Sequence, residues 1–157
     1  MNKITSYTLE EARKKLESYC AYQERCHKEV DRKLDDMNVI PLVKEEIILY
    51  LLQHDFLNEE RFAKSFARGK FIIKRWGKVR ITRELKLRDI SKYNIEVALK
   101  EISIEDYTRT FNVLSEKKCA SIKESNIYKK RKKLADYLLY RGWESELVYQ
   151  KIRELIS

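Results

Sequence analysis

Glycine and proline, the residues that most often form tight turns, are scarce in this chain. Its 157 residues include 3 glycines and 1 proline, while 43% are hydrophobic, which is enough to form a core. A β-sandwich needs many turn-forming residues and strands in which apolar and polar residues alternate. Here the β-branched residues are scattered, and long stretches contain no turn-forming residue. The sequence therefore predicts an all-α protein.

The residues that catalysis and metal binding require are also few. His27 and His54 are the only histidines, and no Ser, Asp or Glu pattern around them suggests a catalytic triad. The chain has no glycine-rich phosphate loop and no HExxH motif. Cys20, Cys26 and Cys119 are odd in number and lack the spacing of a metal or redox site. We therefore expect reduced cysteines, no metal, no cofactor and no enzyme activity, so that the protein acts by binding.

Long apolar runs are missing as well. No segment approaches the roughly 18 continuous apolar residues of a membrane-spanning helix. The N-terminal segment MNKITSYTLEEARKKLESY lacks the apolar core of a secretory signal. Instead, Thr8 followed three residues later by Glu11 predicts the capped start of an amphipathic helix. We expect a cytoplasmic protein without a membrane segment.

Positive charge is concentrated in the middle of the chain. Residues 61–88 contain 11 lysines and arginines and a single acidic residue, Glu84. The preceding 60 residues contain 9 basic and 13 acidic residues, and residues 89–157 contain 14 basic and 11 acidic residues. A basic middle between flanks of low net charge is typical of a protein that binds a polyanion.

The first helix expected in this basic stretch spans residues 59–75. With about 100° between successive residues, Phe62, Phe66 and Ile73 fall on one side and form the predicted buried stripe. The opposite side combines cations with one aromatic residue: Lys64, Arg68, Phe71 and Arg75. Such a face could serve only to keep the helix soluble. An ordinary solvated face, however, carries interleaved acidic residues that form i,i+4 ion pairs, and their scarcity here favours a binding role.

Three segments of the chain align with one another as a repeat. They begin at Glu29, Arg80 and Lys133, so the offsets are 51 and 53 residues, within the range of helical repeat proteins. Apolar residues coincide at four positions of the alignment: Val30, Ile81 and Leu134; Leu34, Leu85 and Leu138; Ile48, Leu99 and Ile152; and Leu51, Ile102 and Leu155. Each segment therefore predicts a pair of helices joined by a turn.

The turn residues support the same alignment. Asn38, Asp89 and Gly142 occupy equivalent positions, and these residue types tolerate the left-handed conformation that ends a helix. Each is followed by an apolar residue that can pack back on the helix: Val39, Ile90 and Trp143. Residues that suit the start of the next helix then follow: Pro41, Ser91 and Ser145. Turn chemistry that recurs three times in one register is less easily produced by chance than apolar spacing.

A further helix is expected before each of these pairs, at residues 8–23, 59–75 and 103–122. The predicted fold is therefore all-α, with three tandem three-helix, helix-turn-helix-like repeats in an elongated, curved array: residues 1–57, 58–102 and 103–157. A unit of about 50 residues is marginal by itself, so neighbouring repeats should pack together.

A second basic run opens the second helix of the third repeat, at residues 129–133. It could be no more than a solvated, frayed helix start. Positive charge at a helix N-terminus opposes the helix dipole, however, and this mildly favours an anionic partner outside the chain.

One motif in the middle of the chain combines order, spacing and charge. Its parts are Glu59-Glu60-Arg61-Phe62-Ala63, then a basic helix, then Trp76-Gly77, then Arg80-Ile81-Thr82-Arg83-Glu84-Leu85. This arrangement resembles the RecX family of regulatory proteins, which modulate the bacterial recombinase RecA. The flanking segments QERCHKEVDRKL and LLYRGWESELVYQKIREL fit as well, so the resemblance covers nearly the whole chain. Asn38 and Asp89 stand where family members commonly have glycine, and Cys26 replaces a usual Ser or Thr.

The resemblance implies a cytoplasmic protein that binds RecA filaments on single-stranded DNA, with a possible direct DNA contact. Lodged in the filament groove, it would restrain recombinase and ATPase activity in DNA repair, recombination and the SOS response. We expect a monomer, because no dimerisation stripe is evident. The predicted contact residues are cations and one aromatic residue of the second repeat and the basic run of the third: Lys64, Arg68, Phe71, Lys74, Arg75, Lys78, Arg83, Lys86, Lys129, Lys130, Arg131 and Lys132.

Two other functions remain open. The chain could bind nucleic acid directly, without a recombinase, through DNA phosphates and without sequence preference, and such binding would depend steeply on salt. It could also be a helical adaptor whose charges only maintain solubility. A sequence-specific helix-turn-helix protein agrees less well with this sequence, because it usually needs one recognition helix and a dimer.

Overall fold

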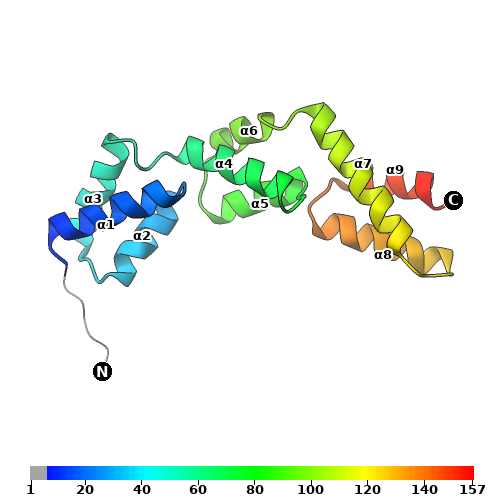
Figure 1. The fold of residues 1–157 in the computed structure, drawn as a ribbon, viewed down its shortest axis with the longest axis horizontal. Coiled ribbons are helices and arrows are strands. Elements are labelled where there is room, and N and C mark those ends of the chain that lie inside the picture. The colour runs from blue at the N-terminus through cyan, green and yellow to red at the C-terminus, as the bar shows by residue number, and fades with distance from the viewer. Residues whose placement is uncertain (1–6) are drawn as a thin grey trace, which may run out of the picture.

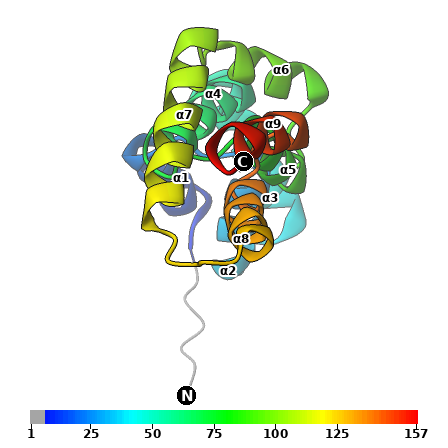
Figure 2. The same cartoon turned by 90° about the vertical axis from the view of Figure 1, so that its right-hand side faces the viewer.

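The computed structural model describes residues 7–157, which contain helices and no strand. The helices are α1 (Leu9–Tyr22), α2 (His27–Asp36), α3 (Pro41–Gln53), α4 (Glu59–Ile72), α5 (Lys78–Leu87), α6 (Lys92–Lys100), α7 (Ile104–Ser121), α8 (Ile127–Tyr140) and α9 (Ser145–Leu155). They form three tandem three-helix repeats in an elongated array (Figure 1). Seen from the C-terminal end, α7, α8 and α9 lie in front of the other two repeats (Figure 2). The predicted fold is confirmed, and residues 1–6 of the first predicted repeat lie outside the described residues.

The starts of the helices follow from local side-chain chemistry. The Thr8 hydroxyl accepts a hydrogen bond from the backbone N–H of Glu11 at 3.1 Å, as the sequence predicted. Ser91 caps α6 in the same way. Pro41 is the first residue of α3, where a missing N–H costs nothing because that group has no partner inside the helix. Ser145 is the first residue inside α9 rather than its cap.

The three turns identified by the repeat alignment have the same geometry. Asn38, Asp89 and Gly142 all have positive φ, at 59°, 58° and 88°. In each turn the following residue donates its backbone N–H to the carbonyl of a leucine five positions earlier, at 3.1, 3.1 and 3.2 Å. This is the Schellman pattern, which satisfies carbonyls that the helix end leaves free. The accepting leucines are fully buried, at the predicted core positions Leu34, Leu85 and Leu138.

Two hydrophobic cores divide the array unequally. The first repeat has its own core, which includes Leu16, Leu34 and Leu51. The second and third repeats share one core, which extends from Phe62 in α4 to Ile156 after α9. Neighbouring repeats therefore meet in two different ways. We call the contact between the first and second repeats the first junction, and the contact between the second and third repeats the second junction.

At the second junction two stretches of backbone lie in direct contact. The N–H of Gly77 donates to the carbonyl of Arg141 at 2.9 Å, and the N–H of Val79 donates to the carbonyl of Gly142 at 3.0 Å. A Cβ atom added at Gly77 would lie 2.4 Å from the Gly142 carbonyl oxygen, and one added at Gly142 would lie 2.1 Å from the Cβ of Arg80. Only glycine permits this close approach of the two backbone segments.

An aromatic cluster fills the space beside this backbone contact. Trp143 is buried, and its indole N–H donates to the carbonyl of Arg75 at 3.2 Å. The ring of Tyr107 lies between those of Trp143 and Phe71, at centroid distances of 4.6 and 5.9 Å. The Tyr107 hydroxyl donates to the Glu144 carboxylate at 2.6 Å. Burial and this hydrogen bond raise the pKa of Tyr107 well above its usual value, because both disfavour the phenolate.

Charged side chains make most of the first junction. Arg61 at the start of α4 forms ion pairs with Glu24 and Asp55 of the first repeat. Lys28 donates to the carbonyl of Leu87 at 3.0 Å and lies 3.6 Å from Asp89. Cys26 also lies here and is buried in the larger core.

Within residues 7–157 no helix is long and apolar enough to cross a membrane. The same range contains no group of His, Cys, Asp and Glu side chains that could hold a metal ion. Cys20, Cys26 and Cys119 are free and buried. Burial raises the pKa of the Cys20 thiol to about 11 and that of Cys26 to about 12, so both thiols are protonated and unreactive at neutral pH.

Candidate polyanion interface

The outer face of α4 differs from the prediction at two residues. Phe71 is 6% exposed and Ile73 is 76% exposed, so the prediction that Phe71 faces outward and Ile73 inward was wrong. The reason is that α4 is buried on two sides, because it packs on α6 and also places Phe71 against Tyr107 of the third repeat. Helical periodicity indicates one buried stripe and carries no information about a second face that a distant repeat covers. Phe71 therefore does not belong to an exposed contact surface.

Lys64 is held by two carboxylates. Its ammonium lies 3.3 Å from Glu60 and 3.5 Å from Glu101. The hydrogen bond to Glu60 raises the pKa of Lys64 above its usual value. The expectation that this face lacks interleaved acidic residues was therefore wrong at the start of α4, because Glu60 supplies an i,i+4 pair and the end of α6 supplies Glu101. Arg68, by contrast, is exposed and forms no ion pair within residues 7–157.

A groove between the end of α4 and the helices α7 and α8 gathers cations from two repeats. Because α4 ends at Ile72 and Arg75 has a positive φ of 57°, Lys74 and Arg75 lie in the following turn and not on the helix as predicted. The groove has a volume of about 450 Å³, and none of the described residues that line it is acidic. We call it the basic groove, and its cations are Lys74, Arg75, Lys117, Lys118 and Arg141.

Tyr137 orients two of these cations. The guanidinium of Arg141 lies 3.8 Å from the centre of the Tyr137 ring, and the ammonium of Lys118 lies 4.6 Å from it. Cation–π contacts of this kind hold a charged group in place without neutralising it. A concave surface that carries one sign of charge concentrates its potential, so the basic groove can attract and hold phosphates or carboxylates.

The outer face of α5 forms a second cationic surface. Lys78, Arg83 and Lys86 line a shallow groove of about 590 Å³ whose described lining contains no acidic residue. Arg83 and Lys86 are exposed and lie opposite the fully buried Ile81 and Leu85, as predicted. The Lys78 ammonium lies 4.6 Å from the centre of the Tyr107 ring, so this side chain is tied to the second junction.

The basic run at the start of α8 is partly engaged within the chain. Lys132 forms an ion pair with Asp136 at 2.6 Å, and Arg131 donates to the carbonyl of Ile156 at 3.0 Å. Lys129 and Lys130 form no ion pair with any residue of the described range 7–157. Arg131 is held by a neutral carbonyl, so among the described residues of the predicted second contact Lys129, Lys130 and Arg131 carry charge that no carboxylate compensates.

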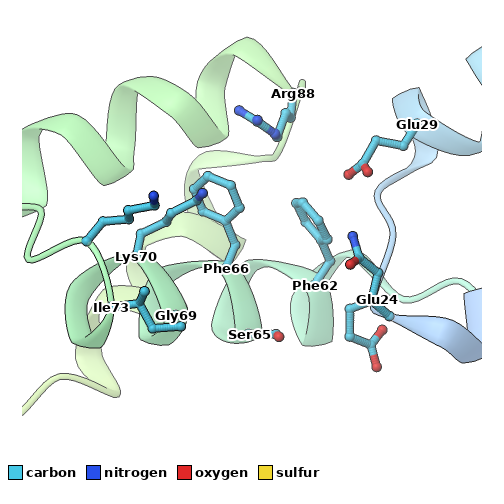
Figure 3. Close-up of a pocket in the computed structure, with 11 residues that line it drawn as sticks. Glu24, Glu29, Phe62, Ser65, Phe66, Gly69, Lys70, Ile73 and Arg88 are labelled. Carbon is cyan, nitrogen blue, oxygen red and sulfur yellow. The ribbon is translucent and has the colours of Figure 1, made fainter.

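A cleft of mixed charge lies between α4 and the first repeat (Figure 3). Phe66 stands between Lys70 and Arg88, whose charged groups are 5.4 and 4.8 Å from the centre of its ring. Glu24 and Glu29 reach the cleft from the first repeat. Because the cleft carries both signs of charge, it suits a polyanion less well than the basic groove does.

Three of the five cations in the basic groove were missed by the sequence analysis. Arg141 could have been found, because it stands directly before the turn residue Gly142 in the segment LLYRGWESELVYQKIREL, which carries part of the family resemblance. For Lys117 and Lys118 the sequence held no such indication. Their position beside Lys74 and Arg75 depends on how the third repeat packs against the second.

Comparison with known proteins identifies relatives for most of the chain. Residues 58–99 match the family model for the second three-helix domain of RecX, and residues 105–152 match that for the third. Regulatory protein RecX of Serratia proteamaculans is 31% identical over 121 residues, which are 77% of this chain and 70% of that protein. Regulatory protein RecX of Bacillus cytotoxicus is 26% identical over 138 residues, which are 88% of this chain and 51% of that protein. The chain thus spans about half the length of the Bacillus relative.

Solved structures show the same fold. The crystal structure of RecX from Lactobacillus salivarius superposes with a TM-score of 0.79 and 24% identity, over 94% of this chain and 96% of that chain. A crystal structure of regulatory protein RecX superposes with a TM-score of 0.78 and 21% identity, over 93% of this chain and 73% of that chain. At these identities the similarity establishes the fold alone.

Proposed function

Because this chain belongs to the RecX family of regulatory proteins, we propose that it binds RecA filaments on single-stranded DNA in the cytoplasm and restrains their recombinase and ATPase activities. The observation that carries the proposal is the combination of family membership with a groove of five cations and no acidic lining residue. A nucleoprotein filament is a long polyanion of repeating subunits. An elongated array of repeats can lie along such a partner and contact successive subunits.

The proposed contact surface combines predicted residues with those that the fold added. Exposed cations of α4 and α5 and those of the basic groove form its main part: Arg68, Lys74, Arg75, Arg83, Lys86, Lys117, Lys118 and Arg141. Lys129 and Lys130 form a second contact. Lys64 and Lys132 contribute less, because binding an external anion would require them to leave their carboxylate partners.

A second function deserves a direct test because the basic groove would also suit bare nucleic acid. Cations from separate helices can follow the phosphates of a strand without reading its sequence. Such binding would not need a recombinase. The two functions can be distinguished by the amount of this protein at which RecA is inhibited. A filament regulator acts below the amount that coats the DNA, whereas a nucleic-acid binder acts only as it coats the DNA.

The deciding experiment follows ATP hydrolysis by RecA on single-stranded DNA while this protein is titrated in. DNA binding without RecA is measured at the same salt. Inhibition at amounts far too small to coat the DNA supports a regulator of the filament. Inhibition that only follows coating of the DNA, or no inhibition, overturns the proposal and leaves the general nucleic-acid binder.

A charge-reversal variant tests the surface itself. Lys74→Glu combined with Lys117→Glu should weaken filament binding by about tenfold or more and lower its salt dependence, because two cations that face the partner are lost. The matched control, Arg32→Glu with Lys92→Glu, changes the charge equally at exposed residues outside the grooves and should bind normally. Equal binding by both variants would remove the basic groove from the contact surface.

A further inference from the structure

Helix α3 has an exposed face that its own repeat does not use. It packs against α1 and α2 and buries Ile47, Ile48 and Leu51. On its outer side Leu42 and Leu49 are 74% and 55% exposed. Between these two leucines lie exposed acidic residues, so that the stripe at positions i, i+3, i+4 and i+7 is Leu42, Glu45, Glu46 and Leu49.

Helix α5 has a face of the opposite charge. It packs on α4 and α6 through the buried Ile81 and Leu85. Its outer side exposes Val79 and Leu87, at 50% and 60%, and these residues line the shallow groove of about 590 Å³. The stripe at positions i, i+4, i+7 and i+8 is Val79, Arg83, Lys86 and Leu87.

These two stripes complement each other. Each has apolar residues at its ends and two like charges in the middle, acidic on α3 and basic on α5. Packed together, the helices would bury the four apolar side chains and pair both glutamates with cations. We propose that α3 of one copy of this chain packs against α5 of a second copy.

The arrangement of the repeats supports a contact between copies. Within one chain, α3 and α5 belong to different repeats, and the long connection through α4 lies between them (Figure 1). In a single copy the leucines on the outer side of α3 therefore stay exposed. The expectation of a monomer rested on the lack of a visible stripe. The sequence of α3 is apolar on both sides, so only the fold shows which leucines face outward.

One helix pair is a small interface, so the association should be weak and should appear as the concentration rises. A symmetric dimer would form the α3–α5 contact twice, and a head-to-tail arrangement would form it once per copy and continue into a chain. Either way the contact covers Arg83 and Lys86. If the proposed function holds, self-association and filament binding therefore compete for these two cations.

The test is the molar mass of the purified protein by sedimentation equilibrium, from micromolar to millimolar concentration at low salt, without RecA or DNA. The wild type should form dimers or longer species. Glu45→Lys with Glu46→Lys, and separately Arg83→Glu with Lys86→Glu, should each weaken association at least about tenfold, because like charges then face each other. The variant with all four substitutions restores opposite charges and should associate again.

Asp36→Lys with Glu96→Lys is the matched control for added positive charge, since both residues are exposed and lie outside the two stripes. It should associate like the wild type. A wild type that stays monomeric at every concentration overturns the proposal, as does unchanged association of the Glu45→Lys, Glu46→Lys variant. Failure of the fourfold variant to regain association also overturns it. Because RecA is absent, these outcomes are independent of the ATPase experiment.

Discussion

The first junction joins two repeats through charged side chains, whereas the second joins two repeats through a shared core and a backbone contact. Arg61 and Lys28 make the first junction with partly exposed partners. At the second junction the side chain of Trp143 is buried, and the backbone segments that contain Gly77 and Gly142 are joined by hydrogen bonds. Exposed ion pairs contribute little to stability, while burial of a large aromatic side chain contributes several kcal/mol.

From this difference we expect the second and third repeats to form a rigid part of the array and the first repeat to be more adjustable. The second and third repeats carry the basic groove across the second junction, so its cations keep their spacing. The first repeat is the more acidic part of the chain, and partly exposed ion pairs contribute to its junction, so we expect its angle to change more easily. If the proposed function holds, the basic groove would keep its shape while the first repeat adjusts to the partner.

The largest expected effect comes from breaking the second junction. Gly142→Ala would place a Cβ 2.1 Å from the Cβ of Arg80 at a residue with φ of +88°. We expect a loss of about 3 kcal/mol or more in the free energy of unfolding. Urea denaturation followed by tryptophan fluorescence measures this loss.

Gly69→Ala is the control, because Gly69 lies in the interior of α4 and its added Cβ would meet nothing within 4 Å. This variant should raise the free energy of unfolding by about 0.5–1 kcal/mol. Equal stability of the two variants would refute the close backbone contact.

Breaking the first junction should change shape more than stability. Arg61→Leu removes the pairs with Glu24 and Asp55 and should cost about 1 kcal/mol, because the groups are partly exposed. The radius of gyration from small-angle scattering should increase as the first repeat moves away, and 1 M salt should do the same to the wild type. The control is Arg109→Leu, which removes a 2.9 Å pair with Asp106 inside one repeat and should leave the shape unchanged. An Arg61→Leu variant with the wild-type radius would show that apolar contacts hold this junction.

The smallest expected effect concerns a turn at the first junction. Asp89 has a positive φ of 58°, which strains a residue with a side chain. Asp89→Gly removes this strain and should raise the free energy of unfolding by about 0.5–1 kcal/mol. It also removes an exposed pair with Lys28 at 3.6 Å, worth about 0.5 kcal/mol or less. Asn38→Gly relieves the same conformation, with φ of 59°, in a turn of the first repeat. The difference between the two variants in urea denaturation estimates the Lys28–Asp89 pair. Net destabilisation by Asp89→Gly would mean that the ion pair outweighs the turn strain.

Local features of the fold could be read from the sequence because their causes are local. The cap at Thr8 depends on a residue three positions away. Each of the turns at Asn38, Asp89 and Gly142 depends on one residue with positive φ. The residue after it donates a hydrogen bond to a leucine carbonyl five positions earlier. The outward direction of Arg83 and Lys86 likewise follows from helical spacing within α5. Interactions of this range are encoded in consecutive residues.

The sequence by itself therefore determined the all-α class, the three repeats, the turns that join their helices and the concentration of positive charge in the middle of the chain. The tertiary structure alone decided that Phe71 is buried, that Lys117 and Lys118 stand beside Lys74, and that the two junctions differ. The physical reason is that these features arise where one repeat packs on another. Spacing along a single helix records which side is apolar, but it does not record which distant surface will cover that side.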